Sequence, residues 1–253
     1  MLVEQFICGN DNLGVLIHDE MTGKTASIDA PNATIIHEQL VRFGWQLDAI
    51  FITHHHQDHI VGVEELRALT GAVIYAPKID NLRFMPTDKL LVDGEVFQFG
   101  RYFIKALATP GHTLDSMCFY CPQPKLIFTG DTLFSLGCGR FFEGTPMMML
   151  QSLKKLRSLP DDIQIYCGHE YTLDNASFAY TLDPDNRDLQ NRYDQVAYLR
   201  QHNLSTMPST VGLEKRTNPF LRWDDQVIRH HLMMEDAEDW EVLAEIRKRK
   251  DEF

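Results

Sequence analysis

The sequence has no apolar run that approaches the roughly 20 residues needed to cross a bilayer. Its first residues, MLVEQFICGN, lack the basic segment and long apolar stretch that mark a secretory signal. Positive charge is also scarce, because 24 Lys and Arg stand against 36 Asp and Glu, a formal net charge of -12. Nucleic acids and anionic membrane surfaces attract basic proteins. These absences predict a cytoplasmic protein that binds neither nucleic acid nor membrane.

Cysteine is sparse as well, with five residues scattered through a chain of 253. Small secreted domains carry dense, even sets of cysteines, which this odd set does not resemble. Cys118 and Cys121 form a C-x-x-C pair, but no second pair accompanies it, and residues 117–120 read as a strand. We therefore interpret the cysteines as reduced thiols. The length and 44% hydrophobic content suit one large domain, or one domain with a smaller appendage.

The first two thirds of the chain alternate strand-like and helix-like segments. Apolar periodicity predicts helices over 33–45, 61–71 and 147–159, and strands within 14–19, 24–30, 47–53, 72–77, 90–100, 101–111, 115–122, 125–131 and 163–170. From about residue 173 the spacing is helical throughout, over 173–182, 186–203, 225–234 and 237–253. The sequence thus predicts an α/β domain over residues 1–172 and an α-helical domain over residues 173–253.

Histidine is concentrated in the stretch THHHQDH, which directly follows a predicted buried strand. The spacing H-x-H-x-D-H is formed by His54, His56, Asp58 and His59. Alternate residues of an extended loop point the same way, so His54 and His56 can meet one ion while the chain turns and presents Asp58 and His59 nearby. Two neighbouring metal sites are predicted. His55 would point away from them, and we expect a supporting or structural role for it.

Two metal sites need more ligands than this stretch supplies, and three candidates lie downstream. His112 occurs in ATPGHT, Asp131 in FTGDT and His169 in YCGHE, each after an apolar run and beside a glycine. A glycine lets the backbone approach an ion closely. We therefore predict that these three side chains complete the metal sites.

Five segments together, THHHQDH, GHT, GDT, GCGRFFEGT and GHEYT, resemble the metallo-β-lactamase superfamily. Within it the chain is similar to the glyoxalase II, or hydroxyacylglutathione hydrolase, family, and the likeness extends over nearly the whole chain. The resemblance implies an αββα sandwich followed by a helical domain. It also implies two ions, with His54, His56 and His112 on the first, Asp58, His59 and His169 on the second, and Asp131 bridging them.

Histidine nitrogen and carboxylate oxygen suit zinc, which is the metal we expect, and they also suit iron or manganese. Two cations close together lower the pKa of a shared water and polarise a carbonyl, so hydrolysis by a metal-bridging hydroxide is the expected chemistry, with Asp58 and Asp131 as the catalytic residues. In some relatives the residue at Asp58 is discussed as a base; we expect it to be a ligand first. A thioester suits this site because its leaving thiol has a pKa of about 8.5 and needs no strong acid.

The resemblance implies hydrolysis of S-2-hydroxyacylglutathione, typically S-D-lactoylglutathione, to glutathione and D-lactate, the second step of methylglyoxal detoxification. The alternatives are a glutathione persulfide dioxygenase with one iron, another hydrolase of the same fold, or a metal-binding scaffold without catalysis. The helical tail disfavours the dioxygenase. We expect a monomer or a weak homo-oligomer.

Substrate contacts also follow from the resemblance. Basic groups of the terminal helix, here Arg247 and Lys250, would hold the glycine carboxylate of glutathione. Arg140, Phe142 and Tyr171 are the other implied contacts. Phe142 is a departure, because some relatives have a tyrosine there whose hydroxyl can bind substrate. In a second departure, GHTLDS has Asp115 where glycine is frequent; this carboxylate would either support a ligand histidine or lie exposed.

Overall fold

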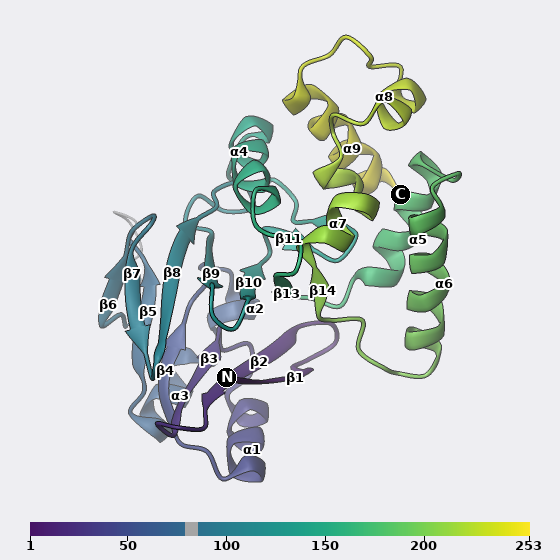
Figure 1. Cartoon of the computed structure of the whole chain (residues 1–253). Helices are drawn as coiled ribbons and strands as arrows, with labels where there is room; N and C mark the ends of the chain where they lie inside the picture. The colour runs from purple at the N-terminus through teal and green to yellow at the C-terminus, as the bar shows by residue number, and fades with distance from the viewer. Residues whose placement is uncertain (79–85) are drawn as a thin grey trace. The chain divides into compact units, whose positions relative to one another are not determined.

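The computed structural model of the chain describes residues 1–78 and 86–253 (Figure 1). Two compact units divide the chain, residues 1–108 with 115–130 and residues 109–114 with 131–253. The chain therefore leaves the first unit after residue 108, returns to it at residue 115 and leaves it again after residue 130. None of the helices in the described ranges is both long and apolar enough to span a membrane.

One sheet of the first unit runs in the order β1-β2-β3-β4-β5-β6. Its strands are Leu2–Ile7, Leu13–Asp19, Lys24–Ile28, Leu47–Phe51, Val73–Pro77 and Lys89–Leu91. The first three strands pair antiparallel and the last four pair parallel, β3 belonging to both sets. The strands predicted within 14–19 and 24–30 are confirmed as β2 and β3, and they pair as a hairpin with Leu16 opposite Ser27.

Two helices, α1 (Ala33–Phe43) and α3 (Val63–Thr70), pack on the core of this sheet. Ile36 of α1 and Leu66 of α3 are fully buried in one cluster with residues of β2, β4 and β5. Helix α3 ends at Gly71, as predicted, in the left-handed conformation with φ 73° that favours glycine.

Four strands of a six-stranded second sheet lie in the first unit and form an antiparallel meander, β7-β8-β9-β10. Its strands are Val96–Phe99, Tyr102–Ala108, Met117–Cys121 and Leu126–Gly130. The ring of Phe51 in β4 lies 5.3 Å from the ring of Phe97 and 5.5 Å from that of Phe119. These contacts place the two sheets face to face, so the unit has a helical layer and two β layers.

All five cysteines are free and buried, in agreement with the prediction of reduced thiols. Cys118 and Cys121 lie in β9, so this C-x-x-C pair belongs to a strand. Burial raises the pKa of Cys8, Cys121, Cys138 and Cys167 to about 12 in each case. A thiol with such a pKa is protonated at neutral pH and reacts slowly.

The second unit is mainly helical. Its helices are α4 (Pro146–Arg157), α5 (Thr172–Leu182), α6 (Arg187–Gln201), α7 (Val211–Thr217), the 3-10 turn η1 (Pro219–Leu221), α8 (Gln226–Leu232) and α9 (Asp239–Glu252). Its strands are short: β11 (Leu133–Phe134) pairs with β12 (Gly137–Cys138), and β13 (Gln164–Cys167) pairs with β14 (Ser209–Thr210). The expectation of helix throughout from residue 173 is wrong at β14, because two residues are too few to interrupt helical periodicity. The domain boundary at residue 172 stays a prediction.

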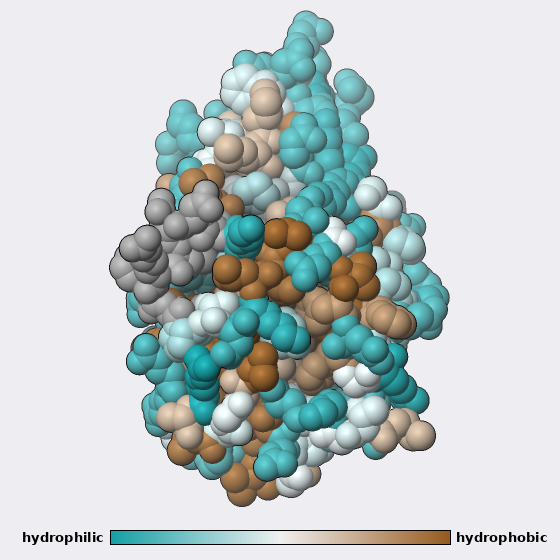
Figure 2. Space-filling view, turned by 90° about the vertical axis from the view of Figure 1, so that its left-hand side faces the viewer, coloured by the Kyte–Doolittle hydropathy of each residue, from teal (hydrophilic) through white to brown (hydrophobic). Residues whose placement is uncertain are grey.

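Some apolar side chains of the first unit face solvent. Leu90, Val96 and Phe103, on β6, β7 and β8, are each more than half exposed. Figure 2 shows apolar residues in brown among polar residues in teal on one face of the molecule. Exposed apolar residues in small groups are ordinary for a protein surface.

Candidate metal centre

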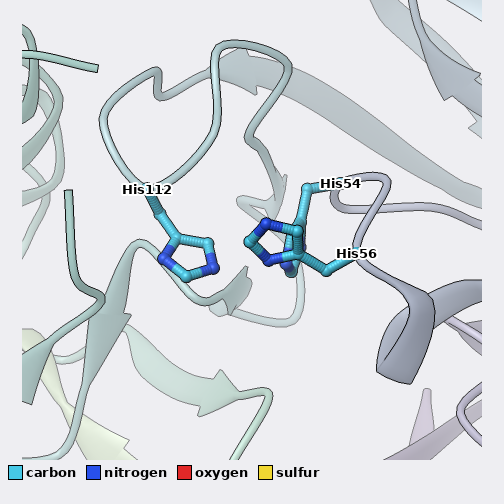
Figure 3. Close-up of side chains that lie close together, drawn as sticks. All are labelled: His54, His56 and His112. Atoms are coloured by element: carbon cyan, nitrogen blue, oxygen red, sulfur yellow. The ribbon is translucent and has the colours of Figure 1, made fainter. Parts of the chain in front are cut away.

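Four predicted ligands come from the segment that follows β4. His54 is buried, and its ring centre lies 4.8 Å from that of His56 and 4.1 Å from that of His59. Figure 3 shows the imidazoles of His54 and His56, and also draws His112. The chain is extended only as far as His56, because Asp58 and His59 lie in a short helix, α2 (Gln57–Ile60). This one-turn helix is the turn that the sequence predicted after the second histidine.

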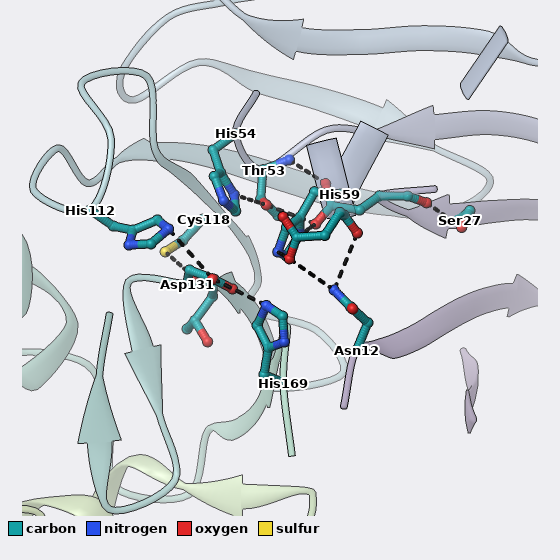
Figure 4. A network of polar contacts seen from close by, with 12 residues as sticks. Asn12, Ser27, Thr53, His54, His59, His112, Cys118, Asp131 and His169 are labelled. Carbon is teal, nitrogen blue, oxygen red and sulfur yellow. Dashed lines mark hydrogen bonds and ion pairs between the residues drawn. The ribbon is translucent and has the colours of Figure 1, made fainter. Parts of the chain in front are cut away.

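A buried carboxylate, Asp29, holds this segment in place. It lies just after β3, and its two oxygens accept hydrogen bonds from the Thr53 backbone N–H at 2.7 Å and the Thr53 hydroxyl at 2.8 Å. Nδ1 of His59 lies 2.8 Å from Oδ2 of Asp29, and Nδ1 of His54 lies 3.0 Å from the Thr53 hydroxyl oxygen. Figure 4 shows these contacts of Thr53, His54 and His59. Both imidazoles therefore donate through Nδ1, which makes Nε2 the basic nitrogen.

Asp29 was missed at the sequence level. The sequence signal for Asp29 was present but weak. In SIDA it is another carboxylate at the end of a buried strand, but no histidine or glycine stands beside it. Metal-binding histidines usually donate their second N–H to a carboxylate or a carbonyl oxygen. Asp29 supplies that partner to His59 directly and to His54 through Thr53.

The carboxylate of Asp58 is oriented from another loop. The side-chain amide of Asn12 donates to Oδ2 and to the backbone oxygen of Asp58, both at 3.2 Å. The same Oδ2 lies 3.7 Å from Nε2 of His59. Asp58 and His59 thus present an oxygen and a nitrogen to the same space.

His55 has a different partner from its neighbours. Its Nδ1 lies 2.8 Å from Oδ1 of Asp115, whose side chain is fully buried. Of the two roles expected for Asp115, exposure is wrong, and the histidine that it contacts is the one not expected to bind metal. The assignment of His55 to a supporting role stays a prediction.

The three downstream candidates lie together in the second unit. His112, Asp131 and His169 are all buried. One oxygen, Oδ2 of Asp131, lies 3.5 Å from Nε2 of His112 and 3.3 Å from Nε2 of His169. Two ligands of one tetrahedral ion, each about 2.0–2.1 Å from it, are separated by roughly 3.3 Å. The spacing fits a carboxylate that shares metal ions with both imidazoles (Figure 4).

Further contacts orient the two imidazoles. Nδ1 of His112 donates to the backbone oxygen of Arg140 at 2.9 Å, which again makes Nε2 the basic nitrogen. The ring of His169 stacks on Tyr171, with centres 4.8 Å apart and planes 3° from parallel. Phe142, which is 61% exposed, lies with its ring 5.3 Å from that of His112. Two predicted substrate contacts therefore border predicted ligands.

The three basic residues predicted to hold substrate occupy different surroundings. Arg140 is largely exposed, and its Nε lies 3.2 Å from Oδ1 of Asp251. Arg247 is buried, lies 2.8 Å from the same oxygen, and donates to the backbone oxygen of Cys138 at 3.0 Å.

Lys250, the third of these basic residues, is partly buried. Its Nζ donates to the backbone oxygen of Asp174 at 3.3 Å and lies 5.1 Å from the ring centre of Phe253. Partial burial lowers the pKa of Lys250. Of the three, Arg140 thus has the most accessible side chain, whereas Arg247 is committed to backbone and carboxylate partners.

These donors fit divalent metal ions. The described residues include groups of histidine and carboxylate side chains that could hold a metal ion. All are nitrogen or oxygen donors, which suit zinc, iron and manganese alike. Of the predicted ligands, His54, His56, Asp58 and His59 belong to the first unit, and His112, Asp131 and His169 belong to the second.

Two family descriptions match the chain and together span most of it. Residues 28–169 match "Metallo-beta-lactamase superfamily", and residues 170–253 match "Hydroxyacylglutathione hydrolase C-terminus". A protein of Bartonella tribocorum named hydroxyacylglutathione hydrolase is 54% identical over 253 residues, all of both chains. A protein of the same name from Brucella anthropi is 54% identical over 251 residues, covering 99% of this chain and 96% of its own length.

Solved structures show the same fold at lower identity. The crystal structure of ETHE1 from Myxococcus xanthus is 23% identical and covers 98% of this chain and 97% of its own, with a TM-score of 0.68. A di-iron-bound form of TTHA1623 is 21% identical and covers 87% of this chain and all of its own, with a TM-score of 0.62. The predicted α/β fold, a metallo-β-lactamase sandwich with a C-terminal helical domain, is confirmed.

Proposed function

The chain belongs to the hydroxyacylglutathione hydrolases of the metallo-β-lactamase superfamily, and on this premise we propose that it hydrolyses S-2-hydroxyacylglutathione thioesters. One observation carries the proposal: the likeness to relatives of that name extends from end to end of the chain. It includes the helical tail, which a likeness confined to the metallo-β-lactamase core would leave out. S-D-lactoylglutathione is the substrate that we expect, with D-lactate and glutathione as products.

The seven ligands divide between two metal ions in this proposal. His54, His56 and His112 hold the first, and Asp58, His59 and His169 hold the second. Asp131 would bridge them, a role supported by one of its two oxygens, Oδ2, lying near Nε2 of both His112 and His169. Zinc is the metal we propose, with iron or manganese as the other candidates that the donors allow.

When bound, two divalent cations lower the pKa of a water molecule and polarise the thioester carbonyl. The residues of the chain supply position and charge. Asp29 and Thr53 fix the imidazoles of His59 and His54 through Nδ1, so that neither ring has to turn during the reaction. Asp58, oriented by Asn12, and Asp131 place negative charge beside the imidazoles.

The chain's other residues act on the glutathione part of the substrate. Arg247 and Lys250 hold the glycine carboxylate of the peptide, and Arg140 is a further contact to it. Tyr171 and Phe142 line the approach to the ligands, and their apolar rings exclude water there. The leaving thiol has a pKa of about 8.5, so it departs as thiolate without a dedicated acid.

We place this reaction in the cytoplasm, where a reducing environment suits five free thiols. The partner is a small molecule, with neither nucleic acid nor membrane involved. A monomer or a weak homo-oligomer is the assembly that we propose.

The test is to incubate the protein, after measurement of its metal content, with S-D-lactoylglutathione and to follow free thiol. Thiol release that depends on bound metal supports the proposal. No release at full metal occupancy would overturn it. Glutathione persulfide is offered separately while oxygen uptake is followed, because uptake without thioester hydrolysis would favour a persulfide dioxygenase instead.

A further inference from the structure

A short buried hairpin connects two parts of the candidate metal centre. Strands β11 and β12 are two residues each, joined by the turn Ser135–Leu136. Asp131 lies two residues before the hairpin, and Arg140 lies two residues after it. Leu136 adopts a φ of 59°, a left-handed conformation that costs about 1 kcal/mol or more for a residue with a side chain. A conformation of this kind persists only where its surroundings hold it.

Side chains of α7 and its C-cap hold this turn. The Leu136 N–H donates to Oε2 of Glu214 at 2.7 Å. The side-chain amide of Asn218 donates to the same oxygen at 3.0 Å, to the backbone oxygen of Gly137 at 3.0 Å and to that of Phe134 at 3.2 Å. The other carboxylate oxygen of Glu214 accepts a hydrogen bond from the Ser209 hydroxyl. Glu214 and Asn218 are completely buried, so water cannot replace these bonds.

Other elements hold the rest of the hairpin. The amide of Asn175, in α5, donates to the backbone oxygen of Ser135 at 3.1 Å. The guanidinium of Arg192, in α6, lies 3.3 Å from the Ser135 hydroxyl. Arg247, in α9, donates to the backbone oxygen of Cys138. Four elements of the helical tail therefore converge on a hairpin of six residues.

The hairpin in turn abuts the ligands. A Cβ placed on Gly139, directly after β12, would overlap the backbone oxygen of Asp131 and lie 2.8 Å from Nδ1 of His112. The next residue, Arg140, offers the oxygen to which His112 Nδ1 donates. With so little space at Gly139, a shift of the hairpin must move Asp131, His112 or both.

We infer that Glu214 is a positioning residue of the enzyme: with Asn218 and Asn175 it clamps the β11–β12 hairpin and thereby sets the places of His112 and Asp131. The inference rests on the proposed function, in which both residues are metal ligands. Glu214 touches neither of them, and it acts through Leu136, Gly139 and Arg140. A carboxylate suits the task because it accepts from all three donors that face it, the Ser209 hydroxyl, the Leu136 N–H and the Asn218 amide.

The test compares four variants of the full-length protein. Glu214→Ala removes the clamp, and Asn175→Ala removes one hairpin bond from a different helix. Glu214→Gln keeps an oxygen for Leu136 and Asn218 while its amide faces Ser209. Thr217→Val is the matched control, since it removes a buried hydroxyl of the same helix that donates to the backbone oxygen of Leu213 and not to the hairpin. Zinc affinity is measured by competition with a chelator, the cobalt(II)-loaded form by its visible spectrum, and stability by thermal unfolding.

We expect Glu214→Ala and Asn175→Ala to weaken zinc binding by about 10-fold or more and to alter the cobalt spectrum. Their kcat should fall while KM stays near the wild-type value. Glu214→Gln and Thr217→Val should match the wild type in zinc affinity, in the cobalt spectrum and in kcat. If Glu214→Ala does not fold, the zinc affinity and cobalt spectrum of Asn175→Ala test the inference.

Lower thermal stability with unchanged zinc affinity and an unchanged spectrum would overturn the inference, because the network would then serve the fold alone. Loss of zinc affinity in Thr217→Val equal to that in Asn175→Ala would also overturn it. Absence of thioester hydrolysis in the wild type would instead refute the proposed function. The zinc and cobalt comparisons do not depend on that activity.

Discussion

Nδ1 of His59 lies 2.8 Å from the buried carboxylate of Asp29, which also accepts two hydrogen bonds from Thr53. In Asp29→Asn one of the two oxygens becomes an NH₂ group, which faces a donor from Thr53 or His59. We expect affinity for the more weakly bound of the two zinc ions to fall by about 10-fold, by titration against a chelator. Asp48→Asn is the control, because Asp48 accepts from the Thr25 N–H in the same unit, away from the ligands. Equal affinity in wild type and Asp29→Asn would contradict this prediction.

Asp131→Ala should remove both metal and activity. Its oxygen lies near two imidazoles, so its loss deprives both proposed ions of a ligand. We expect less than one equivalent of bound zinc and a fall in kcat/KM of about 10³-fold or more. His55→Ala is the matched comparison and should keep two equivalents, since its partner is Asp115. Full metal content in Asp131→Ala would rule out the bridging role.

Lys250→Ala should mainly affect substrate binding. We expect KM to rise by about 10-fold and kcat to change little, because a charged contact made in both ground and transition states is lost. Lys248→Ala, an exposed change on the same helix, is the control. Partial burial lowers the pKa of Lys250. As pH is increased, the side chain therefore loses its charge, and KM of the wild type starts to rise, at a pH below the usual lysine pKa of about 10.4. A KM that is independent of Lys250 at every pH would refute its role.

Glu214 should contribute to the pH dependence of the free energy of unfolding. Burial raises the pKa of its carboxyl, against hydrogen bonds from Ser209 and Leu136 that lower it. A raised pKa means that the folded state binds more protons than the unfolded state above the usual glutamate pKa of about 4.3. The free energy of unfolding therefore carries a contribution that is complete below that pH and lost as pH rises through the folded-state pKa. Urea unfolding at several pH values should show this slope in the wild type and a flatter one in Glu214→Gln; identical slopes would disprove the assignment.

The sequence predicted the elements that carry long patterns. Helix α1 occupies residues 33–43 of the predicted 33–45, because its apolar spacing is regular and Gly44 ends it in a left-handed conformation. The strand ends at which three candidate ligands lie were predictable for a related reason. His112, Asp131 and His169 each follow an apolar run, and such runs became β8, β10 and β13.

Features without periodicity escaped prediction. Strands of two residues, such as β11 and β12, are too short to alternate, so nothing in FTGDTLFSLGCG indicates a hairpin. Asp29 is a single carboxylate whose importance depends on the distant residue His59. Glu214 lies in GLEKRTN, where a run of charges is typical of a solvated helix face, yet it is completely buried. Long-range hydrogen bonding decides these roles, and a local pattern does not encode it.

The burial of all five cysteines determines how cleanly turnover can be watched. A disulfide reagent that absorbs light on reaction with thiols will colour with released glutathione, while the five thiols of the folded protein stay buried and out of its reach. Without substrate, any slow increase in absorbance then comes from protein molecules that have unfolded and exposed their thiols. The same thiol assay therefore measures the catalytic rate when substrate is present and the unfolding rate when it is absent.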